Sequence, residues 1–125
     1  MNIHEDWLMR QIETMVTAVL HVLFHTDRKS ESIEMETSLS DAVDLGQRET
    51  ILAFLQEGKI CEAENWLFEN LNEDDISWLH TAVYFYSKLN QLSDEYLADR
   101  NFSREEVETG LSEVCRRYGY EWLFS

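Results

Sequence analysis

Apolar residues recur along most of this chain at intervals of three and four positions, the spacing of one face of an α-helix. The pattern predicts helices over residues about 4–27, 41–57, 60–71, 74–90, 93–98 and 103–118. The chain has no proline and four glycines, which disfavours a turn-rich all-β architecture. We therefore expect one all-α domain over residues 1–125, a compact bundle of five to six helices arranged as helical hairpins.

The first predicted helix is more apolar than a surface helix needs to be. Its apolar side chains cover an arc of roughly 200° on a helical wheel. They are Leu8, Met9, Ile12, Met15, Val16, Val19, Leu20, Val22, Leu23 and Phe24. Such a helix needs two packing partners, so we expect the rest of the domain on one side and a second copy of the chain on the other.

Local signals mark several helix boundaries. Gly58 is expected to end the second helix in a left-handed conformation, and Gly119 to end the last one. The expected N-caps are Ser40 or Asp41, Asn72, Ser93 and Ser103, the last within a capping box. In the second helix, the side chains expected to face inward are Leu45, Ile51, Leu52 and Leu55.

Residues 28–40 are polar and serine-rich, and they are predicted to form a loop or mobile linker. The sparse apolar residues Ile33, Met35 and Leu39 could anchor it. At the other end of the chain, residues 120–125 are apolar enough to dock back onto the bundle.

The charge is strongly negative and uneven. The net charge is −15, and residues 31–75 contribute −11 of it from thirteen acids and two bases. Such a field repels nucleic acid and anionic membranes and attracts a basic partner. A solvated, solubilising surface is the more ordinary interpretation.

Cysteine usage and targeting signals favour the cytoplasm. Cys61 and Cys115 are isolated and resemble reduced core thiols more than a disulfide framework. The first residues lack a basic segment typical of a signal peptide, and the apolar run from Met15 to Phe24 is too short to span a bilayer.

The patterns that carry chemistry are weak. His21 and His25 are four residues apart and could share a metal ion, but no third ligand lies nearby in the sequence, and two partly exposed histidines are the ordinary interpretation. Acidic pairs such as Glu62 and Glu64 arise by chance at this composition. There is no phosphate-binding glycine loop and no nucleophile motif. We therefore expect no cofactor and no enzymatic activity.

The aromatic residues are better candidates for function. Trp7, Trp66, Trp78, Trp122 and Tyr84 exceed what a small bundle needs to fill its core. Trp78 is expected in the core of a central helix over residues 74–90, whereas Tyr84 falls on the opposite side with His80. The predicted partner-contact residues are Trp7, Trp66, His80 and Tyr84.

Three segments together resemble a known group of proteins. They are Glu5–Glu13, Gly58–Leu67, and Phe85–Leu97 with Phe102–Val107. The resemblance is to small acidic all-helical proteins of unknown function from Gram-positive bacteria. It implies an all-helical fold and carries no activity, cofactor or catalytic residue.

The segment around Gly58 also resembles a tetratricopeptide hairpin. Gly58 matches the turn glycine, Ala63 the packing alanine, Phe54 the first-helix aromatic residue and Leu67 an apolar position of the second helix. The tryptophan–leucine–glycine run and the closing proline of that motif are absent. The next segment, of about one repeat length, does not repeat the pattern. One hairpin within a bundle therefore fits better than a repeat array.

These observations lead to one main hypothesis and two alternatives. The main one is a non-enzymatic cytoplasmic protein-interaction or scaffold module that binds a protein partner, with a basic one favoured by charge. It binds neither nucleic acid nor membrane. The first alternative is a mimic of nucleic acid that inhibits a basic protein, which requires its carboxylates in one row. The second is a metal-dependent enzyme that uses His21 and His25.

Overall fold

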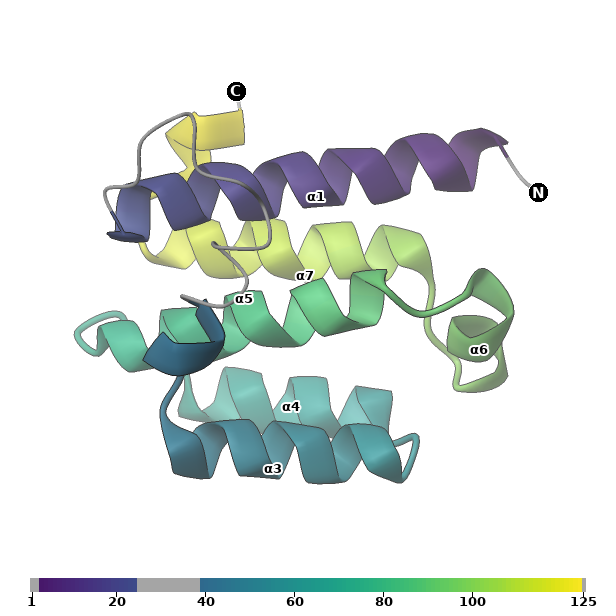
Figure 1. Cartoon of the computed structure of the whole chain (residues 1–125), viewed down its shortest axis with the longest axis horizontal. Helices are drawn as coiled ribbons and strands as arrows, with labels where there is room; N and C mark the ends of the chain where they lie inside the picture. Colours follow the sequence, from purple (N-terminus) through teal and green to yellow (C-terminus); the bar gives the residue numbers. More distant parts are fainter. Residues whose placement is uncertain (1–2, 25–38, 125) are drawn as a thin grey trace.

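The computed structural model describes residues 3–24 and 39–124, and these residues form an all-helical bundle. Figure 1 shows α1 (Ile3–Phe24) and α7 (Arg104–Arg117) on one side of α5 (Ile76–Asn90), and the hairpin of α3 (Leu45–Gln56) and α4 (Ile60–Asn70) on the other. A short α6 (Asp94–Asp99) joins α5 to α7, and a 3-10 helix, η1 (Glu121–Phe124), follows α7. The predicted all-α bundle is confirmed.

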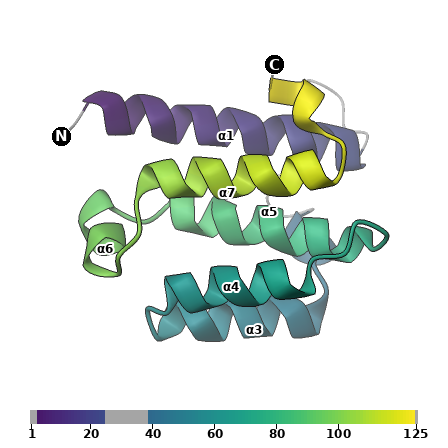
Figure 2. The ribbon, with the colours of Figure 1, turned by 180° about the vertical axis from the view of Figure 1, so that it is seen from behind.

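α5 is the central helix, as predicted. It contacts α1 and α7 on one side and α3 and α4 on the other, in agreement with both ribbon views (Figures 1 and 2). The side chains of Leu79, Ala82, Phe85 and Leu89 are fully buried. Burial of this apolar surface is the main source of stability of such a bundle.

The prediction that Tyr84 points outward is wrong. Its side chain is buried, with 7% of its surface exposed. Neighbouring helices cover α5 on both sides, so the face opposite Trp78 is also interior, and Thr81 is buried as well. Periodicity identified one apolar face of this helix but could not show that its other face is covered too.

The wide apolar arc of α1 is covered largely within the chain. Ile12, Val19 and Leu20 are buried, and α1 contacts α5, α7 and η1. The predicted docking of the C-terminal segment accounts for part of this cover. A homodimer through this helix remains a prediction.

The turn between α3 and α4 has the predicted geometry. Gly58 adopts φ +72°, and the backbone N–H of Lys59 donates to the carbonyl of Phe54 at 2.9 Å. A residue with a Cβ disfavours this left-handed conformation, and here a Cβ would also meet the side chain of Arg100. Gly119 ends α7 with φ +81°.

Two predicted helix starts are wrong. Asp44, not Ser40 or Asp41, caps α3 and accepts from the N–H of Gln47 at 2.9 Å. Residues 39–42 instead form a separate helical turn, which includes the last two residues of the predicted loop; the rest of that loop lies outside the described residues.

Asp75, not Asn72, caps α5 and accepts from the N–H of Ser77 at 3.0 Å. Asn72 accepts from the N–H of Asp74 in the preceding turn. Leu45, predicted to face inward, is 58% exposed because it is the first residue of α3. The caps at Ser93 and Ser103 are confirmed.

A buried arginine joins the ends of three helices. The guanidinium of Arg104, at the start of α7, donates to the carbonyls of Asn90 at 2.8 Å and Leu92 at 2.7 Å. It also pairs with the carboxylate of Asp94 at 2.7 Å. The side chain of Asn90 in turn donates to the carbonyl of Met9 in α1. The planar fork of donors therefore holds α6 against the ends of α5 and α7.

We expect Arg104→Met and Arg104→Lys both to lower the free energy of unfolding, by about 2–3 kcal/mol. Methionine leaves the acceptors without a donor, and a lysine ammonium cannot reach them as the forked guanidinium does. Urea denaturation measures the loss, and Arg116→Lys, at an exposed position, is the control. If Arg104→Lys is as stable as the natural chain, a positive charge at this position suffices and the forked donors of arginine are not needed.

Candidate functional site

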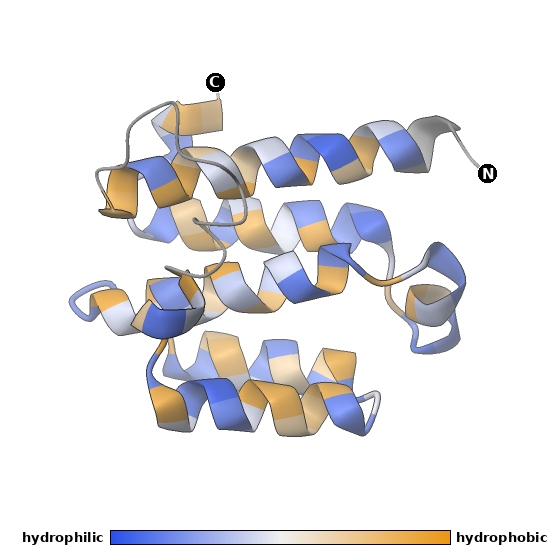
Figure 3. Ribbon diagram, in the orientation of Figure 1, coloured by the Kyte–Doolittle hydropathy of each residue, from blue (hydrophilic) through white to orange (hydrophobic). Residues whose placement is uncertain are grey.

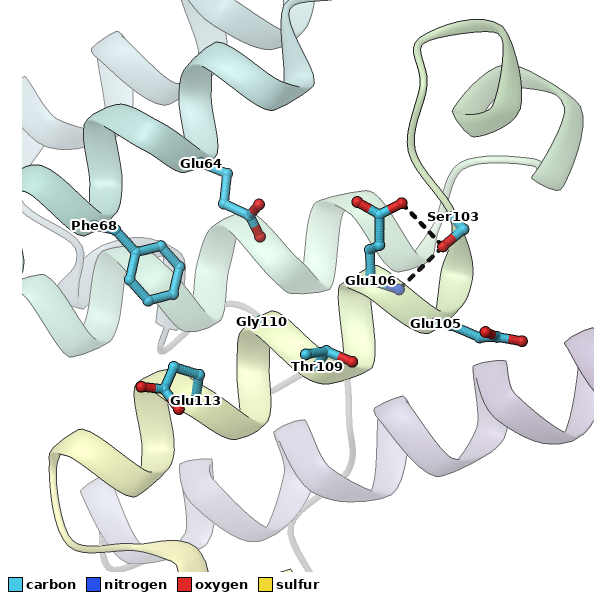
Figure 4. Close-up of a pocket in the computed structure, with 8 residues that line it drawn as sticks. All are labelled: Glu64, Phe68, Ser103, Glu105, Glu106, Thr109, Gly110 and Glu113. Atoms are coloured by element: carbon cyan, nitrogen blue, oxygen red, sulfur yellow. Dashed lines mark hydrogen bonds between the residues drawn. The ribbon is translucent and has the colours of Figure 1, made fainter.

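A cleft of about 590 Å³ lies between α4 and α7. Figure 4 shows Glu64 and Phe68 projecting from α4 toward α7. The facing residues of α7 follow helical spacing, as do the two from α4. The lining residues are Glu64, Phe68, Ser103, Glu105, Glu106, Thr109, Gly110 and Glu113. Four of the eight are glutamates, so the cleft is strongly acidic.

Tyr86 of α5 connects the floor of this cleft to the core. Its ring is buried, and its hydroxyl donates to a carboxylate oxygen of Glu64 at 2.6 Å. Burial and the neighbouring carboxylate raise the pKa of Tyr86 well above its usual range, so the hydroxyl remains a proton donor. The pKa of Glu64 is also raised, chiefly by burial, while the hydrogen bond from Tyr86 opposes the shift.

The two ends of the cleft differ. At one end Ser103 and Glu106 form the capping box of α7, with the N–H of Glu106 donating to the Ser103 hydroxyl at 3.2 Å. At the other end Arg116 and Arg117 donate to the carboxylate of Glu113 at 2.6 and 3.2 Å. These hydrogen bonds lower the pKa of Glu113 to about 2. The negative charge of Glu113 is therefore compensated within the chain.

Gly110 allows this arrangement because it has no side chain. A Cβ at this position would overlap the hydroxyl and ring of Tyr86. A glycine inside a helix usually has a packing reason of this kind, and it is the one sequence signal that could have located the cleft. The sequence pattern did not single out Glu64, Phe68 or Tyr86 as site residues.

The predicted contact residues do not form one surface. The ring of Trp66 packs between those of Phe54 and Trp78, with centroids 6.2 and 5.3 Å away. His80 is half-buried and stacks on Phe24, with centroids 5.6 Å apart. These contacts and the burial of Tyr84 leave Trp7, 59% exposed, as the most accessible of the four.

The structure adds nothing to the metal hypothesis. His21 lies half-buried on α1, and His25 lies outside the described residues. Within the residues that the structure describes, no group of three or more histidine, cysteine, aspartate or glutamate side chains could hold a metal ion. No helix in this part of the chain is long and apolar enough to cross a membrane.

Carboxylates of the acidic middle segment do not form one row. Glu64 turns into the cleft, whereas Glu62, two positions earlier on the same helix, is exposed on another face. Glu57 lies at the α3–α4 turn, where it pairs with Lys59 at 3.0 Å. A mimic of the duplex phosphates needs a regular row, which these residues do not provide.

Comparison with known proteins identifies the family to which the chain belongs. The profile of a family of unknown function, DUF6483, matches residues 2–119. The chain belongs to this family. No curated protein and no solved structure matches the DUF6483 chain significantly. The resemblance to a family of unknown function is thus confirmed, while the Gram-positive origin stays a prediction.

We expect Gly110→Ala to lower the free energy of unfolding by about 1–3 kcal/mol, because the added methyl group displaces the buried ring of Tyr86. Thermal unfolding measures the loss. Gly46→Ala is the matched control, since Gly46 lies within α3 and a Cβ there meets only a side-chain oxygen of Asp44 at 3.4 Å. An equal effect of both substitutions would contradict this packing role of Gly110.

We also expect the contribution of His80 to stability to fall as the pH decreases below about 6.5. Burial lowers the pKa of His80 in the folded state, so protons bind more readily to the unfolded chain. The folded state loses stability as the pH falls through the ordinary histidine range. Urea denaturation at pH 7.5 and 5.5 should show a smaller loss for His80→Phe than for the natural chain. An unchanged loss would exclude this role.

Proposed function

We propose that this protein is a non-enzymatic interaction module that binds a positively charged segment of a partner protein in the cleft between α4 and α7. The observation that carries the proposal is the half-buried Glu64 carboxylate, held by Tyr86 at the floor of an acidic cleft. A cytoplasmic location and a tetratricopeptide-like use of the α3–α4 hairpin belong to the same proposal.

The geometry favours a cation as the bound group. A lysine or arginine side chain that enters the cleft meets Glu64 and Glu106, while its aliphatic part lies against Phe68. Glu64 keeps one oxygen on the Tyr86 hydroxyl, so its orientation is set before the partner arrives. Hydrogen bonds between charged groups in a partly dehydrated site are stronger than neutral ones.

The groups at the cleft favour binding over covalent chemistry. The Ser103 hydroxyl is used in the cap of α7 and has no histidine beside it in the described structure. Burial raises the pKa of the nearby Cys61 thiol, which disfavours the reactive thiolate. Tyr86 likewise holds its proton. These properties support a site that recognises charge without transferring a group.

The nucleic-acid mimic finds less support because its carboxylates point in different directions. The cleft instead concentrates a few of them in a concave site that an extended chain can enter.

The test is a calorimetric titration of the protein with a synthetic peptide of alternating lysine and serine at low ionic strength. We expect Glu64→Gln to weaken binding about tenfold, since a charge-assisted hydrogen bond is lost. Glu69→Gln is the matched control, because Glu69 is exposed on the same helix outside the cleft and its loss changes the net charge equally. Equal weakening by both would mean that only the overall charge attracts the peptide.

The same variant should gain stability. The folded-state pKa of Glu64 is raised, so its contribution to stability decreases as the pH rises through that value. At pH 8 we expect Glu64→Gln to be more stable than the natural chain, and the difference to shrink toward pH 4. Urea denaturation at both pH values measures this. Lower stability of the variant at pH 8 would show that the carboxylate serves the fold.

A further inference from the structure

The outer face of α3 forms a second, smaller groove of about 360 Å³. It is lined by Gly46, Glu49, Thr50, Ala53, Phe54 and Glu57. These positions follow the spacing of one helix face over the whole length of α3. The groove belongs to α3 alone and shares no lining residue with the cleft between α4 and α7.

α3 is apolar on more than the face that it buries. Only Ile51 is fully buried, where α3 packs on the bundle. Phe54 is half-buried, Ala53 is exposed and Leu45, at the start of the helix, is 58% exposed. Figure 3 shows apolar positions spread along this helix among polar ones. The ring of Phe54 lies at the edge of the packed face, where it contacts Trp66 of α4, and Ala53 and Leu45 are exposed beyond it.

Among the described residues, those that line the groove all come from α3 and its C-terminal end. In both ribbon views α3 lies on the opposite side of α5 from α1 (Figures 1 and 2). Within the part of the chain that the structure describes, its main contacts with other helices are to α4 and α5. The side chains on the groove face are small at its centre, where Gly46, Thr50 and Ala53 succeed one another at helical spacing. Small residues allow the axis of a second helix to approach closely.

Charge decides whether a second copy of this chain or a helix of another protein is favoured in the α3 groove. If a second copy packed its α3 antiparallel on this one around Ala53, Glu49 would lie opposite Glu57 of the other copy, and the two chains each carry a net charge of −15. Like charges disfavour that pairing. The groove contains no basic side chain, and Arg48, the one basic residue of α3, donates instead to the carbonyl of Ser40.

We propose that this α3 groove binds an amphipathic helix of a partner protein, with a narrow apolar face and with lysine or arginine along its flanks. The apolar face covers Ala53 and Phe54, and a basic flank pairs with Glu49. Glu57 contributes less because Lys59 already pairs with it. This proposal concerns a different surface and stands independently of the function proposed for the cleft.

The test uses a synthetic helical peptide of about four turns with leucine and alanine on one face and lysine on its flanks. A peptide of the same composition in scrambled order is the control, because it has the same charge and no apolar face. Backbone amide resonances of the isotope-labelled full chain report the site. We expect shifts at Gly46, Thr50 and Ala53 with the helical peptide and none with the scrambled one. Shifts confined to Thr109 and Gly110, or spread over the surface, would overturn the proposal.

Matched variants distinguish binding in the α3 groove from nonspecific attraction of the basic peptide to the acidic chain. Ala53→Gln adds bulk without charge at an exposed helical position and should weaken binding about tenfold, whereas Ala98→Gln, at an exposed alanine of α6, should leave it unchanged. Glu49→Gln should weaken binding more than Glu95→Gln. Sedimentation at several concentrations tests the other occupant. If the chain self-associates and Ala53→Gln abolishes this association, the groove binds a second copy of the chain and not a partner helix.

The effects of two variants on binding of the helical peptide also separate the two proposals. Glu64→Gln should leave the binding of the helical peptide unchanged, since Glu64 lies outside the α3 groove. If Glu64→Gln abolishes that binding and Ala53→Gln does not, the cleft alone is the binding surface and the α3 groove is not one.

Discussion

The contact between Tyr86 and Gly110 sets the geometry on which both the core and the cleft depend. α5 and α7 approach so closely that the tyrosine occupies the space of the missing side chain. The buried ring belongs to the core, and its hydroxyl, also buried, donates to Glu64 of α4. One side chain therefore contacts both neighbouring helices, and the cleft lies where α4 and α7 diverge around it.

Arg104 and Glu64 show two ways of placing a charge inside a small domain. The guanidinium of Arg104 is almost fully buried, yet two carbonyls and the carboxylate of Asp94 surround it. Glu64 receives one hydrogen bond from Tyr86 and no cation from the described chain. Burial, with a smaller contribution from the charge of Glu106, raises the pKa of the Glu64 carboxyl group, and the hydrogen bond from Tyr86 offsets this only in part. The first charge is compensated within the fold, and the second is the one that we propose for binding.

The two grooves give the molecule two surfaces of different character. The cleft between α4 and α7 is the larger one and is lined by four glutamates, and we propose it for single charged side chains of an extended segment. The α3 groove is smaller and partly apolar, and its length matches a few turns of helix. A protein that binds through both faces would act as an adaptor between a basic segment and a basic helix. The acidic charge of the chain favours both kinds of partner and disfavours the pairing of two copies through α3.

Periodicity, caps and turn residues determined the helices of this protein. The spacing of apolar residues located the central helix, and Gly58 and Ser103 marked boundaries where the local chemistry of a turn or cap suffices. Local signals were wrong where several candidates competed, as at Asp44 and Asp75, because each can accept the same kind of N–H donor. Which faces are covered was decided only by the tertiary structure. Tyr84 is buried and Glu64 joins Phe68 and Gly110 because helices distant in the sequence pack around α5, and a helical wheel contains no information about those neighbours.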